Sequence, residues 1–144
     1  MATKESISIL KECDAGAKMA LASLDDVWEH VQQPELRAIL NTTRAQHQMI
    51  SREVQALLQE FGGKEKDPNP ISRSMSAMKT SVKLGLDKSD SAVAALLLEG
   101  CHMGTQSLHR YLNRYRGAEV PARALCRTLV AVEEQLARDM RRFL

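Results

Sequence analysis

Two residues with metal-binding side chains stand three positions apart near the middle of an apolar segment. Glu99 and His102 form a Glu-x-x-His step within LLLEGCHMGTQSLHRYL, residues 96–112. Residues three apart on a helix share a face, so a carboxylate and an imidazole would project together. Iron, manganese and zinc accept this combination of oxygen and nitrogen ligands.

Two further polar residues interrupt apolar stripes in other segments of the chain. Asp14 lies in a stripe that includes Leu10 and Ala17, and His47 lies in one that includes Leu40 and Ile50. Counting from the midpoints of the expected helices places these side chains within a turn or two of one level in a bundle. We therefore consider a candidate Fe, Mn or Zn site, which consists of Asp14, His47, Glu99 and His102.

Packing is the interpretation that we favour over metal binding for these residues. A histidine in a helical seam more often has a hydrogen-bond partner than a metal, and Thr43 or Thr105 would serve for His47. A buried carboxylate needs compensation because a lone charge in the core costs several kcal/mol. Lys18, His47 or a backbone amide would compensate Asp14.

The three cysteines, Cys13, Cys101 and Cys126, fall in three different expected helices and form no Cys-x-x-Cys pair. We expect buried, reduced thiols that pack as small apolar side chains. No cation is clearly placed to lower a thiol pKa, which argues against a reactive thiol, and a redox role for Cys13 or Cys101 is kept as a third alternative.

Apolar residues recurring at alternating steps of three and four predict four long helices. Proline positions suit helix starts, and the Gly62-Gly63 pair suits a helix end. The expected helices cover residues 7–33, 34–61, 90–115 and 121–143, with a short amphipathic helix at 71–85.

These elements predict an all-α, antiparallel four-helix bundle that forms one domain over residues 1–144. No alternating β-branched run bounded by hairpin turns is present, so strands are not expected. The longer connection, between the second and third long helices, carries the short helix and allows a crossover along the bundle.

Residues 92–98, AVAALLL, are apolar on every side of their helix. A helix that faces a single core needs only one apolar stripe, so a second face must be covered. Either the 71–85 helix or another subunit would cover it, and we expect a homo-oligomer, most simply a dimer. The expected interface residues are Met75, Met78, Val93, Leu96 and Leu98.

Composition excludes several classes of protein. The formal net charge of +2 is too small to predict nucleic-acid binding. The run AVAALLL is far too short to cross a membrane, and the start MATKESISIL lacks the apolar region of a secretory signal. With an odd number of cysteines, these features predict a cytoplasmic protein.

Several stretches resemble the ferritin-like four-helix bundles, and most closely a bacterial branch of uncharacterised function. They are ECDAG at 12–16, PELR and LLQEFGG in the second helix, SRSMSAMKTSVK before SDSAVAALLLEG, and LHRYL at 108–112. The resemblance covers nearly the whole chain. It implies a carboxylate-bridged di-iron centre, with a Glu from each of two helices and a Glu-x-x-His from each of the others.

The sequence departs from that ligand set. In the second helix Arg44 stands three residues before His47, where the motif needs a glutamate. In the fourth helix no histidine follows Glu133 or Glu134 at the required spacing. We therefore expect a bundle without catalytic activity or cofactor that self-associates or binds a protein partner. The alternative is an Fe, Mn or Zn oxidoreductase or storage protein with a reduced ligand set.

Overall fold

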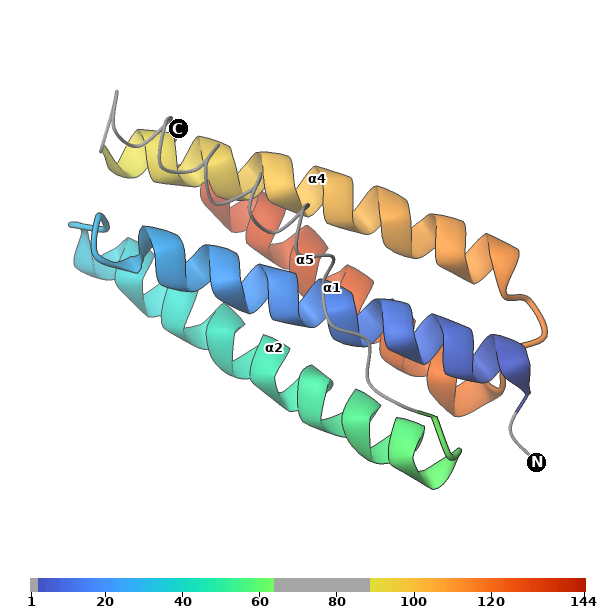
Figure 1. Ribbon diagram of the computed structural model, residues 1–144. Helices are drawn as coiled ribbons and strands as arrows, with labels where there is room; N and C mark the ends of the chain where they lie inside the picture. Colours follow the sequence, from blue (N-terminus) through green and yellow to red (C-terminus); the bar gives the residue numbers. More distant parts are fainter. Residues whose placement is uncertain (1–2, 64–88) are drawn as a thin grey trace.

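The computed structural model describes residues 3–63 and 89–144, and these residues form four long helices without a strand (Figure 1). The helices are α1 (Lys4–Trp28), α2 (Pro34–Glu60), α4 (Asp90–Arg114) and α5 (Val120–Arg141). The predicted all-α four-helix bundle is therefore confirmed. The expected helix at 71–85, with Met75 and Met78, lies outside the described residues.

Helix starts follow the signals in the sequence. The Thr3 hydroxyl accepts a hydrogen bond from the Ser6 amide at 3.0 Å, and the Ser89 hydroxyl accepts one from the Ala92 amide at 3.1 Å. These side chains satisfy amides that a helix start leaves without a carbonyl partner. Pro34 and Pro121 occupy the first turns of α2 and α5, where a missing amide proton costs nothing.

The end of the first helix differs from the prediction. α1 ends at Trp28 rather than near Gln33, and residues 29–33 form the link to α2. The Asp90 carboxylate accepts hydrogen bonds from the Gln32 amide at 2.8 Å and the Gln33 amide at 2.9 Å, which anchors this link to α4. Burial raises the pKa of Asp90, but the hydrogen bonds from these amides outweigh burial and lower it.

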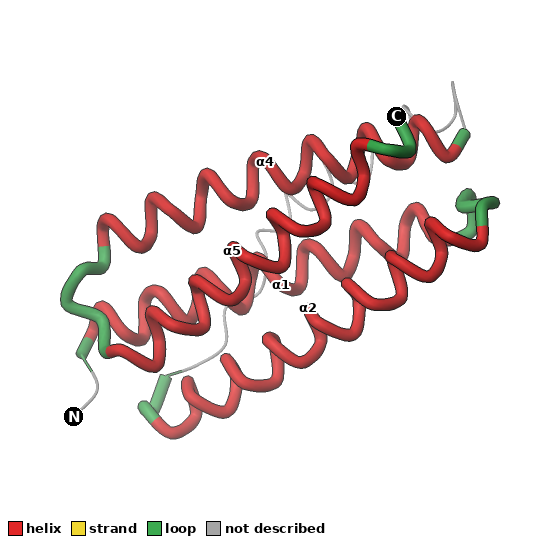
Figure 2. Tube along the Cα trace, turned by 180° about the vertical axis from the view of Figure 1, so that it is seen from behind, coloured by secondary structure: helices red, strands yellow, loops and turns green. Residues whose placement is uncertain are grey.

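The contacts at the two ends define the helix directions (Figures 1 and 2). The start of α4 lies against the α1–α2 link, whereas Gly63 lies against Ile7 and Thr3 donates to the Gly117 carbonyl. α1 and α5 therefore run one way, and α2 and α4 run the other. The chain passes from one end of the bundle to the other between α2 and α4.

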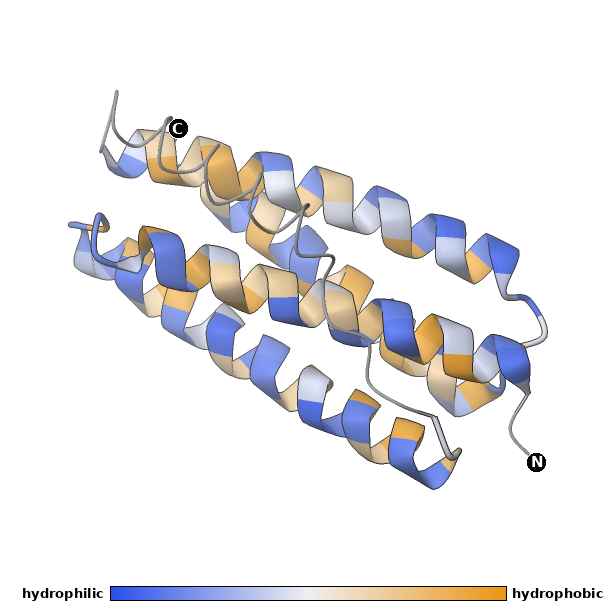
Figure 3. Cartoon of the chain, viewed as in Figure 1, coloured by the Kyte–Doolittle hydropathy of each residue, from blue (hydrophilic) through white to orange (hydrophobic). Residues whose placement is uncertain are grey.

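The core consists of two apolar clusters, one towards each end of the bundle. Figure 3 shows that every helix carries both hydrophobic and hydrophilic residues along its length. Residues of the first cluster, near the α1–α2 link, include Leu24, Val27, Leu40, Val93, Leu97, Leu136 and Met140. Residues of the second include Ile9, Leu10, Ile50, Val54, Leu108, Leu129 and Val130.

Buried polar residues separate the two clusters. Along α2, Thr43 and His47 follow Leu40 of the first cluster and precede Ile50 of the second. Along α5, Glu133 lies between Val130 and Leu136. We call His47, Glu133, Asp14, Thr43 and Ser51 the polar layer.

None of the helices in residues 3–63 and 89–144 combines the length and hydrophobicity that crossing a membrane requires.

Candidate functional site

His47 is held in one orientation inside the bundle. Its side chain is 1% exposed, and Nδ1 lies 2.7 Å from the Thr43 carbonyl oxygen one turn earlier on α2. A carbonyl only accepts hydrogen bonds, so Nδ1 carries a proton and donates it. In the neutral imidazole Nε2 is then an acceptor, and it has no hydrogen-bond partner among the described residues.

Glu133 of α5 is the group that His47 faces. The residue is 7% exposed, and its Oε1 lies 3.9 Å from His47 Nε2. Its Oε2 is buried without a hydrogen-bond partner in the described part of the chain. The 3.9 Å separation is too long for a direct hydrogen bond. With Nε2 unprotonated, the imidazole and the carboxylate present lone pairs to each other here, and a positive charge between them would compensate both.

Helix α4 leaves room for the Glu133 carboxylate. A Cβ atom on Gly104 would collide with Glu133 Oε2. Glycine inside a helix costs about 1 kcal/mol relative to alanine. The space that the Glu133 carboxylate needs explains why a glycine stands at position 104 despite this cost. Cys101, one turn earlier on α4, is buried, and burial followed by the Glu133 charge raises the pKa of its thiol to about 12. Cys101 therefore remains protonated at neutral pH.

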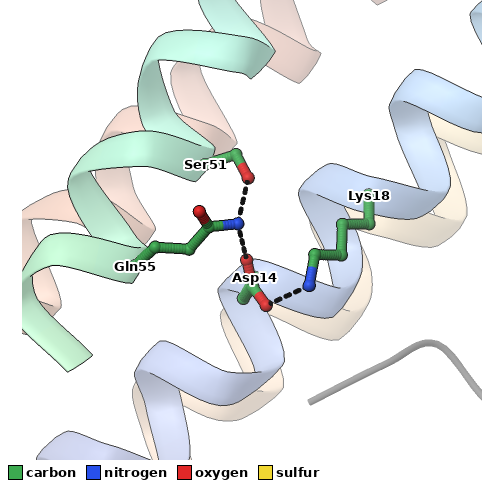
Figure 4. Close-up of polar contacts among 4 residues, drawn as sticks. All are labelled: Asp14, Lys18, Ser51 and Gln55. Carbon is green, nitrogen blue, oxygen red and sulfur yellow. Dashed lines mark hydrogen bonds and ion pairs between the residues drawn. The ribbon is translucent and has the colours of Figure 1, made fainter. Parts of the chain in front are cut away.

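Asp14 is fully buried on α1 but already compensated (Figure 4). The Lys18 ammonium lies 2.9 Å from Oδ2 as an ion pair, and the Gln55 amide donates to Oδ1 at 3.2 Å. The same Gln55 nitrogen lies 3.2 Å from the Ser51 hydroxyl, which ties the contact to α2. Lys18 was among the expected partners, whereas Gln55 was not expected.

The four residues of the candidate metal site do not come together. His102 is exposed because Leu97, Cys101 and Leu108 occupy the inward positions of α4, and Glu99 is half-buried. Among residues 3–63 and 89–144, no three His, Cys, Asp or Glu side chains are grouped so that they could hold a metal ion. Of the predicted ligands, Asp14 and His47 both lie in the polar layer, and His47 faces the Glu133 carboxylate, whose Oε2 has no hydrogen-bond partner in the described part of the chain.

The sequence interpretation missed Glu133 as the partner of His47. The expected inward face of the fourth helix contained Val132, but Glu133 is buried and Val132 is only partly buried. Leu129, Glu133, Leu136 and Met140 follow one another at steps of four, three and four. That spacing was the signal in the sequence, because it places a carboxylate within the apolar seam.

The predicted interface residues divide into two groups. Val93 is fully buried in the apolar core of this chain, so its side chain offers no surface to a partner. Leu96 and Leu98 are half-buried and pack against the edge of the first cluster. The described part of the expected interface therefore reduces to these two leucines.

Together these features define an all-α four-helix bundle with a polar layer across its core. The chain belongs to the family described as a domain of unknown function (DUF2383), which matches residues 5–116. The matched range contains His47, whereas Glu133 and the rest of α5 lie beyond it. The comparison with curated proteins gave no match.

The fold has a counterpart among solved structures. The crystal structure of a DUF305 fragment from Deinococcus radiodurans is similar with a TM-score of 0.75 and 15% sequence identity. The similarity covers 97% of this chain and 95% of that one. At this identity the likeness establishes the shared helical architecture alone.

Proposed function

We propose that the chain is a ferritin-like bundle that binds one divalent transition-metal ion between His47 and Glu133. The helix directions support the ferritin-like assignment. α2 and α4 run in parallel, so one connection crosses the length of the bundle, as in ferritin-like folds. All three cysteines are free, which fits the reducing cytoplasm that we propose as its location.

A di-iron centre does not fit the residues present. It would need carboxylates from all four helices and two imidazoles. The buried part of the described chain offers one imidazole, His47, and two carboxylates at this level, of which Asp14 is engaged by Lys18. Glu133 remains as the single uncompensated carboxylate, so a pair of irons would lack ligands.

The facing pair of unpartnered acceptors supports a single cation. A metal ion between His47 Nε2 and the Glu133 carboxylate would turn two repelling groups into two ligands, in surroundings where charges interact strongly. The Thr43 carbonyl acts as the outer partner that orients the imidazole, as found for metal-binding histidines. Zinc, cobalt, iron and manganese all accept this nitrogen and oxygen pair, with water completing the coordination.

Metal binding can be tested with a histidine control inside the same chain. His109 and Glu134 form a similar pair, 3.8 Å apart, but their side chains are 58% and 50% exposed. Tag-free protein is dialysed to equilibrium against Co²⁺ or Zn²⁺, and bound metal is measured by elemental analysis. We expect about one ion per chain in the native protein and in His109→Gln. His47→Gln should bind about 100-fold more weakly, because even outer-shell changes cost 10–100-fold.

Two outcomes would contradict this proposal. One is native protein that retains no metal after dialysis at metal concentrations in excess of the protein. The other is an equal loss of metal in His47→Gln and His109→Gln, which would indicate surface binding by histidine in general. Circular dichroism of both variants establishes that they are folded.

Self-association is a second candidate function. Ala92, Leu96 and Leu98 are half-buried while the neighbouring Val93 and Leu97 fill the core, so α4 is apolar on two sides here. We propose that a second copy of the chain covers the outer side, because burying apolar surface is the main driving force of association.

Light scattering tests the dimer. The native protein should have twice the chain mass of 16.1 kDa, and the double variant Leu96→Glu/Leu98→Glu should have the mass of one chain. Met49→Glu changes an exposed residue on α2, 61% accessible, and should leave the dimer intact. A native protein that is monomeric at every concentration would exclude self-association.

A further inference from the structure

Two of the three cysteines lie together in the second apolar cluster. Cys13 comes from α1 and Cys126 from α5, and both are fully buried. Neither forms a disulfide. The helices that carry them, α1 and α5, run in the same direction and pack against each other, which brings the two thiols into one cluster although the residues are far apart in the sequence. The proposed metal site uses neither thiol.

The two thiols have unequal chemistry because of their surroundings. A hydrogen bond with Cys126, followed by burial, raises the pKa of Cys13 well above its ordinary value. The same hydrogen bond lowers the pKa of Cys126, burial opposes this, and the charges of Arg123 and Arg127 lower it further. The Cys126 sulfur also lies 3.8 Å from the Leu108 carbonyl oxygen, which fixes its position against α4. The expectation that no cation stands near a thiol was therefore wrong for Cys126.

We propose that Cys13 and Cys126 are a redox pair that hydrogen peroxide converts to a disulfide joining α1 to α5. The Cys126 thiolate attacks one peroxide oxygen, the O–O bond breaks, and the sulfur becomes a sulfenic acid as one water leaves. The Cys13 thiol then attacks the Cys126 sulfur, the S–S bond forms, and the thiol proton leaves with the displaced hydroxyl group as a second water. Two thiols and one peroxide thus give one disulfide and two waters.

Small residues beside the cysteines allow the two helices to approach each other. Ala17 stands one turn after Cys13, Ala122 stands one turn before Cys126, and both alanines are fully buried. A disulfide requires Cα atoms of roughly 4.4 to 6.8 Å separation, which bulky neighbours would prevent. Because the thiols are buried, only a small oxidant can reach them, so hydrogen peroxide fits the site better than a bulky disulfide reagent.

Cys101 provides an internal control for this reaction. It is also buried, but it belongs to the first apolar cluster, whereas Cys13 and Cys126 lie together in the second. Cys101 therefore has neither of the other two thiols in its own cluster to complete a disulfide. Peroxide should therefore link Cys13 to Cys126 and leave Cys101 free.

Mass spectrometry of the full chain tests the pair. The reduced protein is treated with hydrogen peroxide, remaining thiols are alkylated, and peptides are analysed without reduction. We expect a Cys13–Cys126 linked peptide that disappears on treatment with dithiothreitol. Cys101→Ser should form the same link to the same extent, whereas Cys13→Ala should leave Cys126 as a sulfenic or sulfinic acid. In urea the link should lose its selectivity, because it depends on the fold.

Two results would overturn the proposal. The first is oxidation of Cys101 as rapid as that of Cys126 in the folded native protein. The second is a chain whose three thiols all stay free in the fold at peroxide doses that oxidise them in urea. Both readouts use the metal-free protein, so they are independent of the proposed metal site.

Discussion

Replacing Lys18 with methionine should lower the unfolding free energy by about 3 kcal/mol at neutral pH, because it leaves the Asp14 carboxylate buried without its cationic partner. Asp14 is fully buried, and the Lys18 ammonium is its only described cationic partner. The Gln55 amide would remain as a single neutral donor. We use the lower end of the range for buried pairs because Lys18 is 25% exposed. Denaturation in urea measures the change.

The double variant Asp14→Asn/Lys18→Met separates charge from packing. An asparagine at position 14 keeps an oxygen for the Gln55 amide and needs no cation, so most of the lost stability should return. A loss of less than about 1 kcal/mol in Lys18→Met would show that the pair behaves as an exposed one. A double variant no more stable than Lys18→Met would show that the carboxylate charge is not the cause.

Glu133→Gln should have opposite effects on stability and metal binding. The amide group of glutamine can donate to His47 Nε2, which has no partner, so the metal-free protein should gain about 1 kcal/mol. For a chain of this size that corresponds to a rise in Tm of about 4 °C. The variant should also bind Co²⁺ or Zn²⁺ about 100-fold more weakly, because it lacks the anionic ligand. Calorimetric unfolding and metal titration give the two values.

Glu134→Gln is the matched control for this variant. Glu134 is the neighbouring residue on α5 but is exposed, so its substitution should change stability by less than about 0.5 kcal/mol. Metal binding should stay at the native level. A Glu133→Gln protein that is less stable without metal, yet keeps native metal affinity, would refute the assignment of His47 and Glu133 as a cation site.

The fold was predictable because the signals for it are local. Recurring apolar residues defined each helix, and Pro34, Pro121 and Ser89 marked starts that the structure confirms. The end of α1 was not predictable by the same means. Its link is fixed by Asp90, a residue distant in sequence whose carboxylate binds the Gln32 and Gln33 amides. A local pattern contains no information about such a contact.

The candidate site was predictable only in part. His47 was identified because a histidine interrupts an apolar stripe, and the structure buries it. Glu133 was not predicted because the Glu-x-x-His motif pairs a glutamate with a histidine on one helix, whereas Glu133 is on α5 and His47 is on α2. His102 was included because it follows Glu99 at helical spacing. Spacing relates two side chains to each other but does not tell which of them faces inward.

The division of the core by the polar layer has a consequence for helix alignment. Leucine seams repeat, so a helix displaced lengthwise by one turn would still find hydrocarbon opposite hydrocarbon over most of its length. In such a displaced bundle Asp14 would keep Lys18, which is on the same helix, but would lose the Gln55 amide, and the Glu133 carboxylate would lie against an apolar cluster instead of His47. Placing a buried carboxylate against hydrocarbon would cost several kcal/mol, comparable to the stability of a whole domain. A few buried polar groups thus fix the lengthwise register of the four helices.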